Sequence, residues 1–204
     1  LDEITIFNNS PKLAVNYPEK PKTYGTLFLP RATYYTGRID VHDLNWGSEG
    51  LWAVNTLFSC LCQINSDYSF VPKWKPNFIT DLMPEDRCHL NGMTLINEKP
   101  AYMTSLSATN TKEGWRENID CSGLLMQVPD GKIILDKLPM PHSPRYSGNN
   151  QLFFLLSGTG ELVKYCIRTG EISKTSLGGF VRGMAEYRNF LFIGLSKIRK
   201  SSKT

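Results

Sequence analysis

The chain has 204 residues, of which 41% are hydrophobic and 11% aromatic, so it can build one substantial core. Its formal net charge is only +4. The basic residues are scattered except for a cluster at residues 197–203, which is typical of a solvated tail rather than of a nucleic-acid-binding surface. No stretch approaches the about 18 apolar residues of a membrane span, and no signal-peptide pattern opens the chain. Composition therefore argues against nucleic-acid and membrane partners.

The five cysteines favour free thiols in a reducing compartment, and hence a cytoplasmic protein. Cys60 and Cys62 alternate along an expected strand and share one face. A Cys-x-Cys pair could instead be half of a metal site, but nothing nearby completes a four-ligand zinc set.

The first 41 residues predict a strand, a turn and a strand over residues 4–17. Residues 26–29 add a short strand, which we expect Pro30 to end.

A strand–turn–strand unit then occurs four times. Its first strands are expected at residues 42–46, 89–95, 142–146 and 182–187, and its second strands at 51–56, 101–105, 151–156 and 190–195. The units start 47, 53 and 40 residues apart, within or close to the range of propeller blades. Further strands are expected between them, at 60–64, 69–71, 123–128, 132–135, 161–167 and 171–176.

This pattern predicts an all-β propeller of four-stranded blades, one domain over residues 1–204. Residues 1–41 look like outer strands, and residues 182–204 supply inner strands alone. The two ends could complete one blade and close a small ring. Alternatively, the chain is an internal fragment of a larger propeller of about six blades, which we favour. Six aromatic residues are expected in the core between blades: Trp46, Trp52, Phe153, Phe154, Phe190 and Phe192.

All three histidines, His42, His89 and His142, occupy nearly the same point of the repeated unit, and Arg182 occupies it in the fourth. Equivalent positions of a closed ring converge on its axis, so these side chains are expected to line one axial pocket. Matching the Gly-Met pairs of the second and fourth units puts Asn91 opposite Arg182, which leaves His89 two residues earlier.

Two interpretations of the histidines remain open. Three imidazoles could hold a divalent transition metal (iron, zinc or manganese), with Asp40, Asp43 or Asp86 accepting a hydrogen bond from the other ring nitrogen. Alternatively, the histidines line a polar, water-filled channel and bond to backbone or substrate. Arg182 favours the channel, because a guanidinium repels a divalent ion, and it could hold an anionic substrate.

Two loops carry further candidates. Glu85 or Asp86 could act as a general acid or base beside an anion-binding Arg87, or the loop could contain only a salt bridge. In the long segment 107–120, Trp115 and Arg116 could form a lid over the pocket, unless Arg116 merely pairs with Glu117. Four more residues could join the same mouth: Arg31, Tyr34, Tyr35 and Arg145.

Residues 74–78, WKPNF, and residues 84–92, PEDRCHLNG, resemble an uncharacterised, mostly bacterial family of unknown function, sometimes joined to tetratricopeptide repeats. The resemblance spans roughly residues 27–198. It implies a propeller-like fold and a longer parent chain, and it brings no established activity.

The sequence thus predicts a histidine-lined pocket that binds a small polar or anionic ligand. In an enzyme, the three histidines would hold a metal, Asp86 or Glu85 would move protons, and an anion would be oriented by Arg87, Arg116 or Arg182. The alternative is a scaffold for protein partners without catalysis, and the fold alone does not decide between them.

Overall fold

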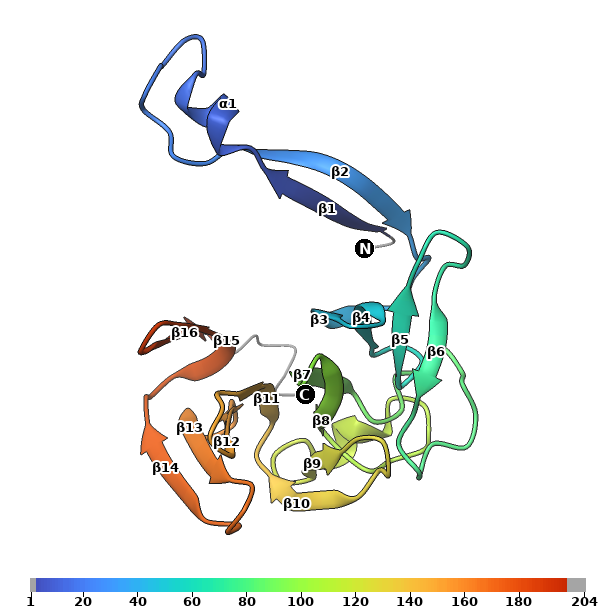
Figure 1. Ribbon diagram of the computed structural model, residues 1–204. Helices are drawn as coiled ribbons and strands as arrows, with labels where there is room; N and C mark the ends of the chain where they lie inside the picture. Colours follow the sequence, from blue (N-terminus) through green and yellow to red (C-terminus); the bar gives the residue numbers. More distant parts are fainter. Residues whose placement is uncertain (1–2, 198–204) are drawn as a thin grey trace.

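The computed structural model describes residues 3–197, which form five antiparallel sheets in which strands adjacent in sequence pair (Figure 1). The first four-stranded sheet contains β3 (Val41–Gly47), β4 (Gly50–Asn55), β5 (Cys60–Ile64) and β6 (Val71–Trp74). The second contains β7 (Leu90–Ile96), β8 (Lys99–Ser105), β9 (Gly123–Gln127) and β10 (Ile133–Leu138). The third contains β11 (Pro141–Tyr146), β12 (Gln151–Leu156), β13 (Glu161–Cys166) and β14 (Ile172–Ser176).

Two further sheets have two strands each. One pairs β1 (Glu3–Asn9) with β2 (Phe28–Tyr35), and the other pairs β15 (Phe180–Tyr187) with β16 (Phe190–Ser196). The helices are short: α1 (Pro11–Val15) and a 3-10 turn, η1 (Gly114–Asn118).

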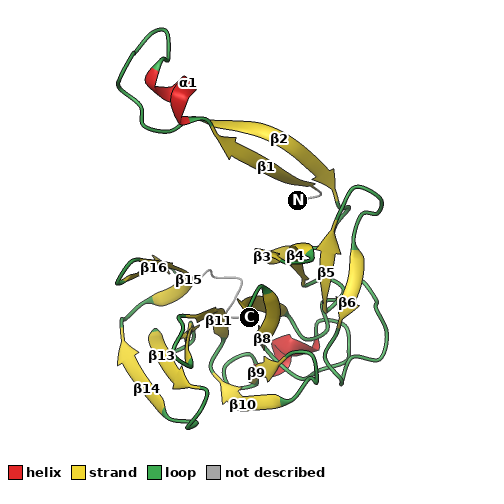
Figure 2. Ribbon diagram, in the orientation of Figure 1, coloured by secondary structure: helices red, strands yellow, loops and turns green. Residues whose placement is uncertain are grey.

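The sheets fan out around a common centre, with the first strand of each four-stranded sheet innermost and the last outermost (Figures 1 and 2). The inner strands β3, β7, β11 and β15 contact one another in that order. This arrangement confirms the predicted all-β propeller of four-stranded blades. Because β1–β2 and β15–β16 are separate sheets, the ends of the chain do not complete one blade between them within residues 3–197.

Apolar side chains of neighbouring blades form the core. Between the first and second blades, Val54 and Leu61 pack in one cluster with Met93 and Met126. Phe154 belongs to the equivalent cluster between the second and third blades. Strands covered on both faces lose the alternation of polar and apolar residues, as in parallel sheets buried on both sides. Every residue of β4 from its second position onward is accordingly buried.

The N-terminal hairpin differs from the prediction in two places. Residues 11–15 form the helix α1 instead of a second strand, with Pro11 in its first turn, where a missing N–H is tolerated. β2 continues through Pro30. Pro30 pairs opposite Phe7, next to a register shift after Ile6, and an edge strand or a bulge is where a sheet accepts proline.

The expected aromatic core is only partly present. Trp52 and Phe154 are buried, whereas Trp46, Phe190 and Phe192 are 62%, 66% and 58% exposed. Trp46 lies on β3 in the first blade, and Phe190 and Phe192 lie on β16. Leu191 and Ile193 of β16 pack against Leu155 of the third blade, whereas Phe190 and Phe192 alternate with them along the strand and lie on its other face.

Candidate functional site

One position recurs on the inner strands that surround the centre. It is occupied by His42, Asn91, His142 and Arg182: the first three directly follow the first paired residue of their inner hairpin, and Arg182 follows the second. In all four hairpins, the pairing register shifts at this residue or directly after it. A β-bulge bends its strand and redirects a side chain. The bulges therefore coincide with the residues expected at the axis, and the register confirms Asn91 as the second blade's equivalent.

The three histidines lie around one cavity of about 740 Å³, as their repeated position predicted. Arg182, Arg116 and Trp115 line the same cavity. Asp86 lines an adjoining cavity that shares His42 and His89 with the first.

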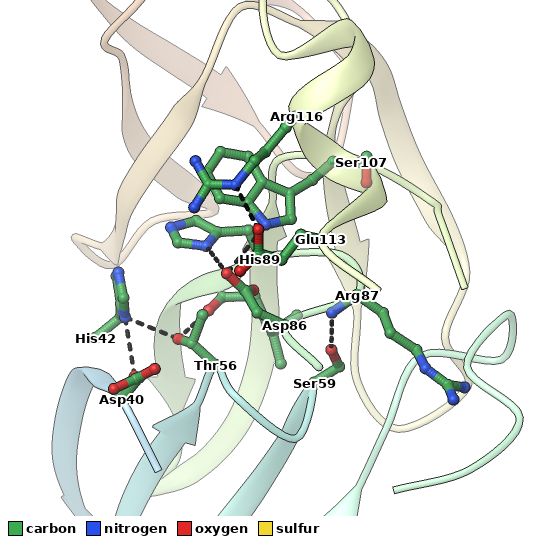
Figure 3. A network of polar contacts seen from close by, with 12 residues as sticks. Asp40, His42, Thr56, Ser59, Asp86, Arg87, His89, Ser107, Glu113 and Arg116 are labelled. Atoms are coloured by element: carbon green, nitrogen blue, oxygen red, sulfur yellow. Dashed lines mark hydrogen bonds and ion pairs between the residues drawn. The ribbon is translucent and has the colours of Figure 1, made fainter. Parts of the chain in front are cut away.

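The orientation of His42 is determined by hydrogen bonds at one ring nitrogen (Figure 3). Its Nδ1 lies 2.9 Å from the main-chain oxygen of Asp40 and 2.8 Å from Oγ1 of Thr56. Thr56 donates its hydroxyl hydrogen to the main-chain oxygen of Leu90 in the next blade, at 2.5 Å. Both partners of Nδ1 therefore accept, so Nδ1 carries the ring hydrogen. Nε2, the other ring nitrogen, has no hydrogen-bond partner among residues 3–197.

His142 repeats this arrangement. Its Nδ1 lies 2.9 Å from the main-chain oxygen of Met140 and 2.9 Å from Oγ of Ser157. Ser157 donates to the main-chain oxygen of Val181 in β15, at 2.5 Å. Each histidine is thus linked through a hydroxyl to the inner strand of the next sheet.

The second blade makes the same link with a different residue. Nδ2 of Asn91 donates directly to the main-chain oxygen of Pro141 in the third blade, at 3.0 Å. Thr104 donates to Oδ1 of the same amide, at 2.7 Å. Pro141 occupies the position that Leu90 and Val181 occupy in their strands. The links therefore join β3, β7, β11 and β15 in succession.

His89 reaches the cavity from just before β7, with a left-handed backbone (φ 50°). Asp86 Oδ2 lies 2.8 Å from its Nδ1 and also accepts from Nε1 of Trp115, at 3.0 Å. The His89 ring stacks against Trp115 at 4.3 Å between centroids, and the Arg116 guanidinium lies 4.2 Å from the Trp115 ring centroid. His89 meets His42 edge to face, 4.7 Å between centroids. The second histidine is therefore oriented by a carboxylate rather than by a carbonyl and a hydroxyl.

Burial is the main reason why two of the imidazoles favour the neutral form. It lowers the pKa of His42, and the neighbouring His89 lowers it further. Burial, followed by the charge of Arg182, lowers the pKa of His142 to about 3. Both rings are neutral at pH 7, and Nε2 of each is a hydrogen-bond acceptor.

The histidines as placed do not match the expected three-imidazole metal site. Within residues 3–197, no group of three or more His, Cys, Asp or Glu side chains could hold a metal ion. Of the three suggested aspartates, Asp86 orients His89 by its carboxylate, whereas Asp40 contacts His42 through its main-chain oxygen.

Asp43 instead pairs with Arg145, 102 residues away in sequence. The two side chains form hydrogen bonds of 3.0 and 3.3 Å. Asp43 also accepts from the main-chain nitrogen of Met93, and Arg145 donates to the main-chain oxygen of that residue. This half-buried pair joins the first and third blades across the second.

The structure places Glu85 and Arg87 outside the cavity. They pair with each other at 2.8 Å, and Arg87 also donates to Asn110 at 2.9 Å. Figure 3 shows the Arg87 guanidinium on the side away from the histidines. This geometry corresponds to the loop salt bridge that the sequence left open as the alternative.

The long segment 107–120 lies against the cavity through Trp115 and Arg116. Arg116 pairs with Glu113 at 3.0 Å, rather than with the expected Glu117. The remaining mouth candidates lie on β2 and do not line this cavity: Arg31, Tyr34 and Tyr35.

Sequence reasoning missed the residues that orient the histidines. Thr56 and Ser157 lie 14 and 15 residues after their histidines, each directly after the second strand of its unit. That shared position was the available signal. Asn91 was aligned with the histidine position but was given no role.

The cysteines agree with the interpretation as free thiols. Cys60, Cys62 and Cys88 are buried and unpaired. Burial raises the pKa of the Cys62 thiol to about 12. Among residues 3–197, no helix is long and apolar enough to cross a membrane.

Comparison with known proteins yields a family but no activity. No curated protein matches the chain. Among solved structures, the extracellular domain of BT4673 from B. thetaiotaomicron is 11% identical, with a TM-score of 0.48 over 76% of this chain and 19% of that one. Virginiamycin B lyase from Staphylococcus aureus is also 11% identical, with a TM-score of 0.46 over 85% of this chain and 62% of that one. The chain therefore spans less than two thirds of either structure. A family model matches residues 1–204, and the chain belongs to that family, Domain of unknown function (DUF4915).

Proposed function

We propose that the axial cavity binds a small polar or anionic ligand. One observation carries this proposal: all three histidines of the chain line a single cavity of about 740 Å³ together with Arg116 and Arg182. Pockets of this size with a few convergent polar groups are typical of small-molecule sites.

The electrostatics support an anionic group on the ligand. Burial is the main cause of the lowered pKa of His42 and of His142, and the charge of Arg182 lowers both further. A negative charge that enters the cavity acts on these rings in the opposite direction and is attracted by the same guanidinium. Strongly perturbed groups in a cavity are a common mark of a binding site.

If the site is catalytic, His89 is the best candidate for proton transfer. The Asp86 carboxylate holds its Nδ1, which leaves Nε2 as the nitrogen for exchanging a proton with a ligand. Neither Glu85 nor Arg87 is needed for this chemistry. A metal-dependent site would require the three imidazoles to move together first.

Histidine NMR tests the proposal directly, because every imidazole signal of the chain comes from this cavity. Inorganic phosphate and citrate are titrated into the uniformly ¹⁵N-labelled full chain. We expect saturable shifts of at least two imidazoles, weakened in Arg116→Ala. Arg168→Ala, which removes an exposed guanidinium from the β13–β14 turn, is the matched control and should leave them unchanged.

Two results would contradict the anion proposal. Imidazole signals that ignore both anions at millimolar concentration would remove its basis. Signals that respond to Zn²⁺ or Mn²⁺ alone would favour the metal-binding alternative.

A different observation favours a second candidate, a scaffold for protein partners. Aromatic side chains are exposed at one end of the arc, on β15–β16: Tyr187, Phe190 and Phe192. Exposed apolar surface of this kind often marks an interaction site. A partner that is lost by Phe190→Ser with Phe192→Ser, and retained by His42→Asn with His142→Asn, would support the scaffold.

We also propose a cytoplasmic location, as expected for a chain with five free cysteines. Disulfide formation in the protein isolated from its native cells would contradict this location.

A further inference from the structure

The hydrogen bonds of the cavity histidines determine what a ligand must offer them, if the cavity binds a ligand as proposed above. A carbonyl oxygen can only accept a hydrogen bond. The main-chain oxygens of Asp40 and Met140 therefore require a hydrogen on Nδ1 of His42 and His142, respectively.

The relay hydroxyls impose the same tautomer independently. Thr56 uses its only hydrogen for the main-chain oxygen of Leu90, so its oxygen can only accept from His42. Ser157 does the same between His142 and Val181. Two separate acceptors thus fix Nδ1–H on each ring.

Nε2 is consequently the acceptor atom of both neutral rings. In the described part of the chain it has no hydrogen-bond partner, and both histidines line the cavity. A bare nitrogen lone pair attracts an O–H or N–H donor and repels an oxyanion. An oxyanion alone would therefore find two unsuitable neighbours in these rings.

The remaining charged groups of the cavity have the opposite preference. Arg116, Arg182 and Lys197 line it and attract a carboxylate or phosphate. Their charge also disfavours a ligand whose donors belong to an ammonium group. Neutral hydroxyl groups are donors that satisfy the histidines without this repulsion.

We infer that the ligand is a hydroxylated organic anion, whose hydroxyl groups donate to Nε2 of His42 and His142 while its anionic group lies towards the arginines. This inference rests on the proposed function and narrows it to a substrate class. Sugar acids and hydroxycarboxylates meet the requirement, whereas simple fatty acids and neutral polyols meet only half of it.

Three six-carbon probes test the two requirements, hydroxyl groups and an anionic group, separately. Gluconate carries hydroxyl groups and a carboxylate, hexanoate carries only the carboxylate, and sorbitol only hydroxyl groups. Each is titrated into the ¹⁵N-labelled full chain while the imidazole signals are followed. We expect gluconate to bind at least about tenfold more tightly than hexanoate, because its hydroxyl groups add two hydrogen bonds. We expect a similar preference over sorbitol, because only gluconate offers a carboxylate to the arginines. His42 and His142 should keep Nδ1–H in the complex.

Asn91 of the second blade suggests which substitutions to make at the two histidines. His42→Asn and His142→Asn install the residue that Asn91 already represents at the equivalent position, where an amide makes the inter-blade link directly. These variants should fold, with melting temperatures within a few degrees of the parent. Each should lose most of the preference for gluconate over hexanoate, whereas Arg168→Ala should retain it.

The outcomes distinguish this inference from the proposed function. If hexanoate binds as tightly as gluconate, with or without uptake of a proton from solvent by the imidazoles, the cavity binds anions but the hydroxylated class is wrong. If sorbitol binds as tightly as gluconate, the anionic requirement is wrong. If no probe, phosphate included, shifts any imidazole, both proposals fail.

Discussion

The first and third blades differ from the second at the centre of the molecule. His42 and His142 have the same two kinds of acceptor at Nδ1, a carbonyl two residues earlier and the hydroxyl of the residue that directly follows the adjacent strand. In the second blade, Asn91 occupies that position, and His89 comes two residues earlier, oriented by Asp86.

What stays constant is the link to the next inner strand, whereas the group offered to the cavity varies. A histidine needs a hydroxyl to reach the next carbonyl, while the amide of Asn91 reaches it unaided. The second blade can therefore present a histidine that takes no part in the link. As a result, His42 and His142 offer Nε2 to the cavity as a hydrogen-bond acceptor, whereas His89 is paired with the Asp86 carboxylate.

The largest expected effect concerns the pair that joins the two similar blades across the second. Arg145→Met leaves Asp43, whose side chain is 12% exposed, without its cation. We expect the free energy of unfolding to fall by about 3 kcal/mol, as when one partner of a buried pair is removed. Urea denaturation measures it. Arg38→Met, which removes the cation of an exposed pair with Asp40, should cost no more than about 0.5 kcal/mol. Equal losses of unfolding free energy in the two variants would show that the Asp43–Arg145 pair does not stabilise the packing of the blades.

The next effect is a pH dependence from the third blade. The pKa of His142 in the folded protein, about 3, lies below the usual value near 6.5, first because of burial and then because of Arg182. Between these values, the unfolded chain binds a proton that the folded protein does not, so stability falls as pH falls. We expect a loss of about 2 kcal/mol between pH 7 and pH 5 from this residue. In His142→Asn, urea denaturation at the two pH values should not show this loss. The same loss of unfolding free energy in the variant would contradict its assignment to His142.

A smaller effect is expected from the relay hydroxyl of the first blade. Thr56→Val keeps the side-chain shape but removes the hydroxyl between His42 and Leu90. We expect a loss of about 1 kcal/mol in thermal or urea unfolding. Thr56→Ser retains the hydroxyl and is the control. If the Thr56→Val and Thr56→Ser variants are equally stable, the hydroxyl link contributes nothing to the stability of the fold.

The smallest expected effect is confined to the second blade. Trp115→Phe keeps a ring beside His89 but removes the Nε1 donor to Asp86. We expect the His89 imidazole signal to shift, with a stability loss of about 0.5 kcal/mol. The signal of His142 serves as the internal reference, and an equal shift there would mean that the change is not local.

Much of the fold follows from local signals. The repeat spacing and the hairpin turns predicted most strands of the three complete blades, because strand propensity and turn chemistry act over a few residues. The convergence of His42, His89 and His142 followed from the repeat as well. The exposure of Trp46 and Phe190 did not, because it depends on whether a neighbouring sheet covers the strand.

The site was predicted less completely than the fold. The pairing of Arg145 with Asp43 joins residues 102 positions apart, and no local pattern contains that information. The separation of Asp86 from Arg87 depends on the left-handed backbone at Asp86, which turns neighbouring side chains to different sides of the loop.

The amino-acid sequence specifies the repeated unit, its strands and the side chains that meet at the centre, since periodicity and turn residues are local properties. It does not specify which nitrogen of each imidazole carries the hydrogen. That choice depends on a carbonyl and a hydroxyl brought together by strand pairing, and on a carbonyl of the next blade, whose positions are set only when the sheets pack.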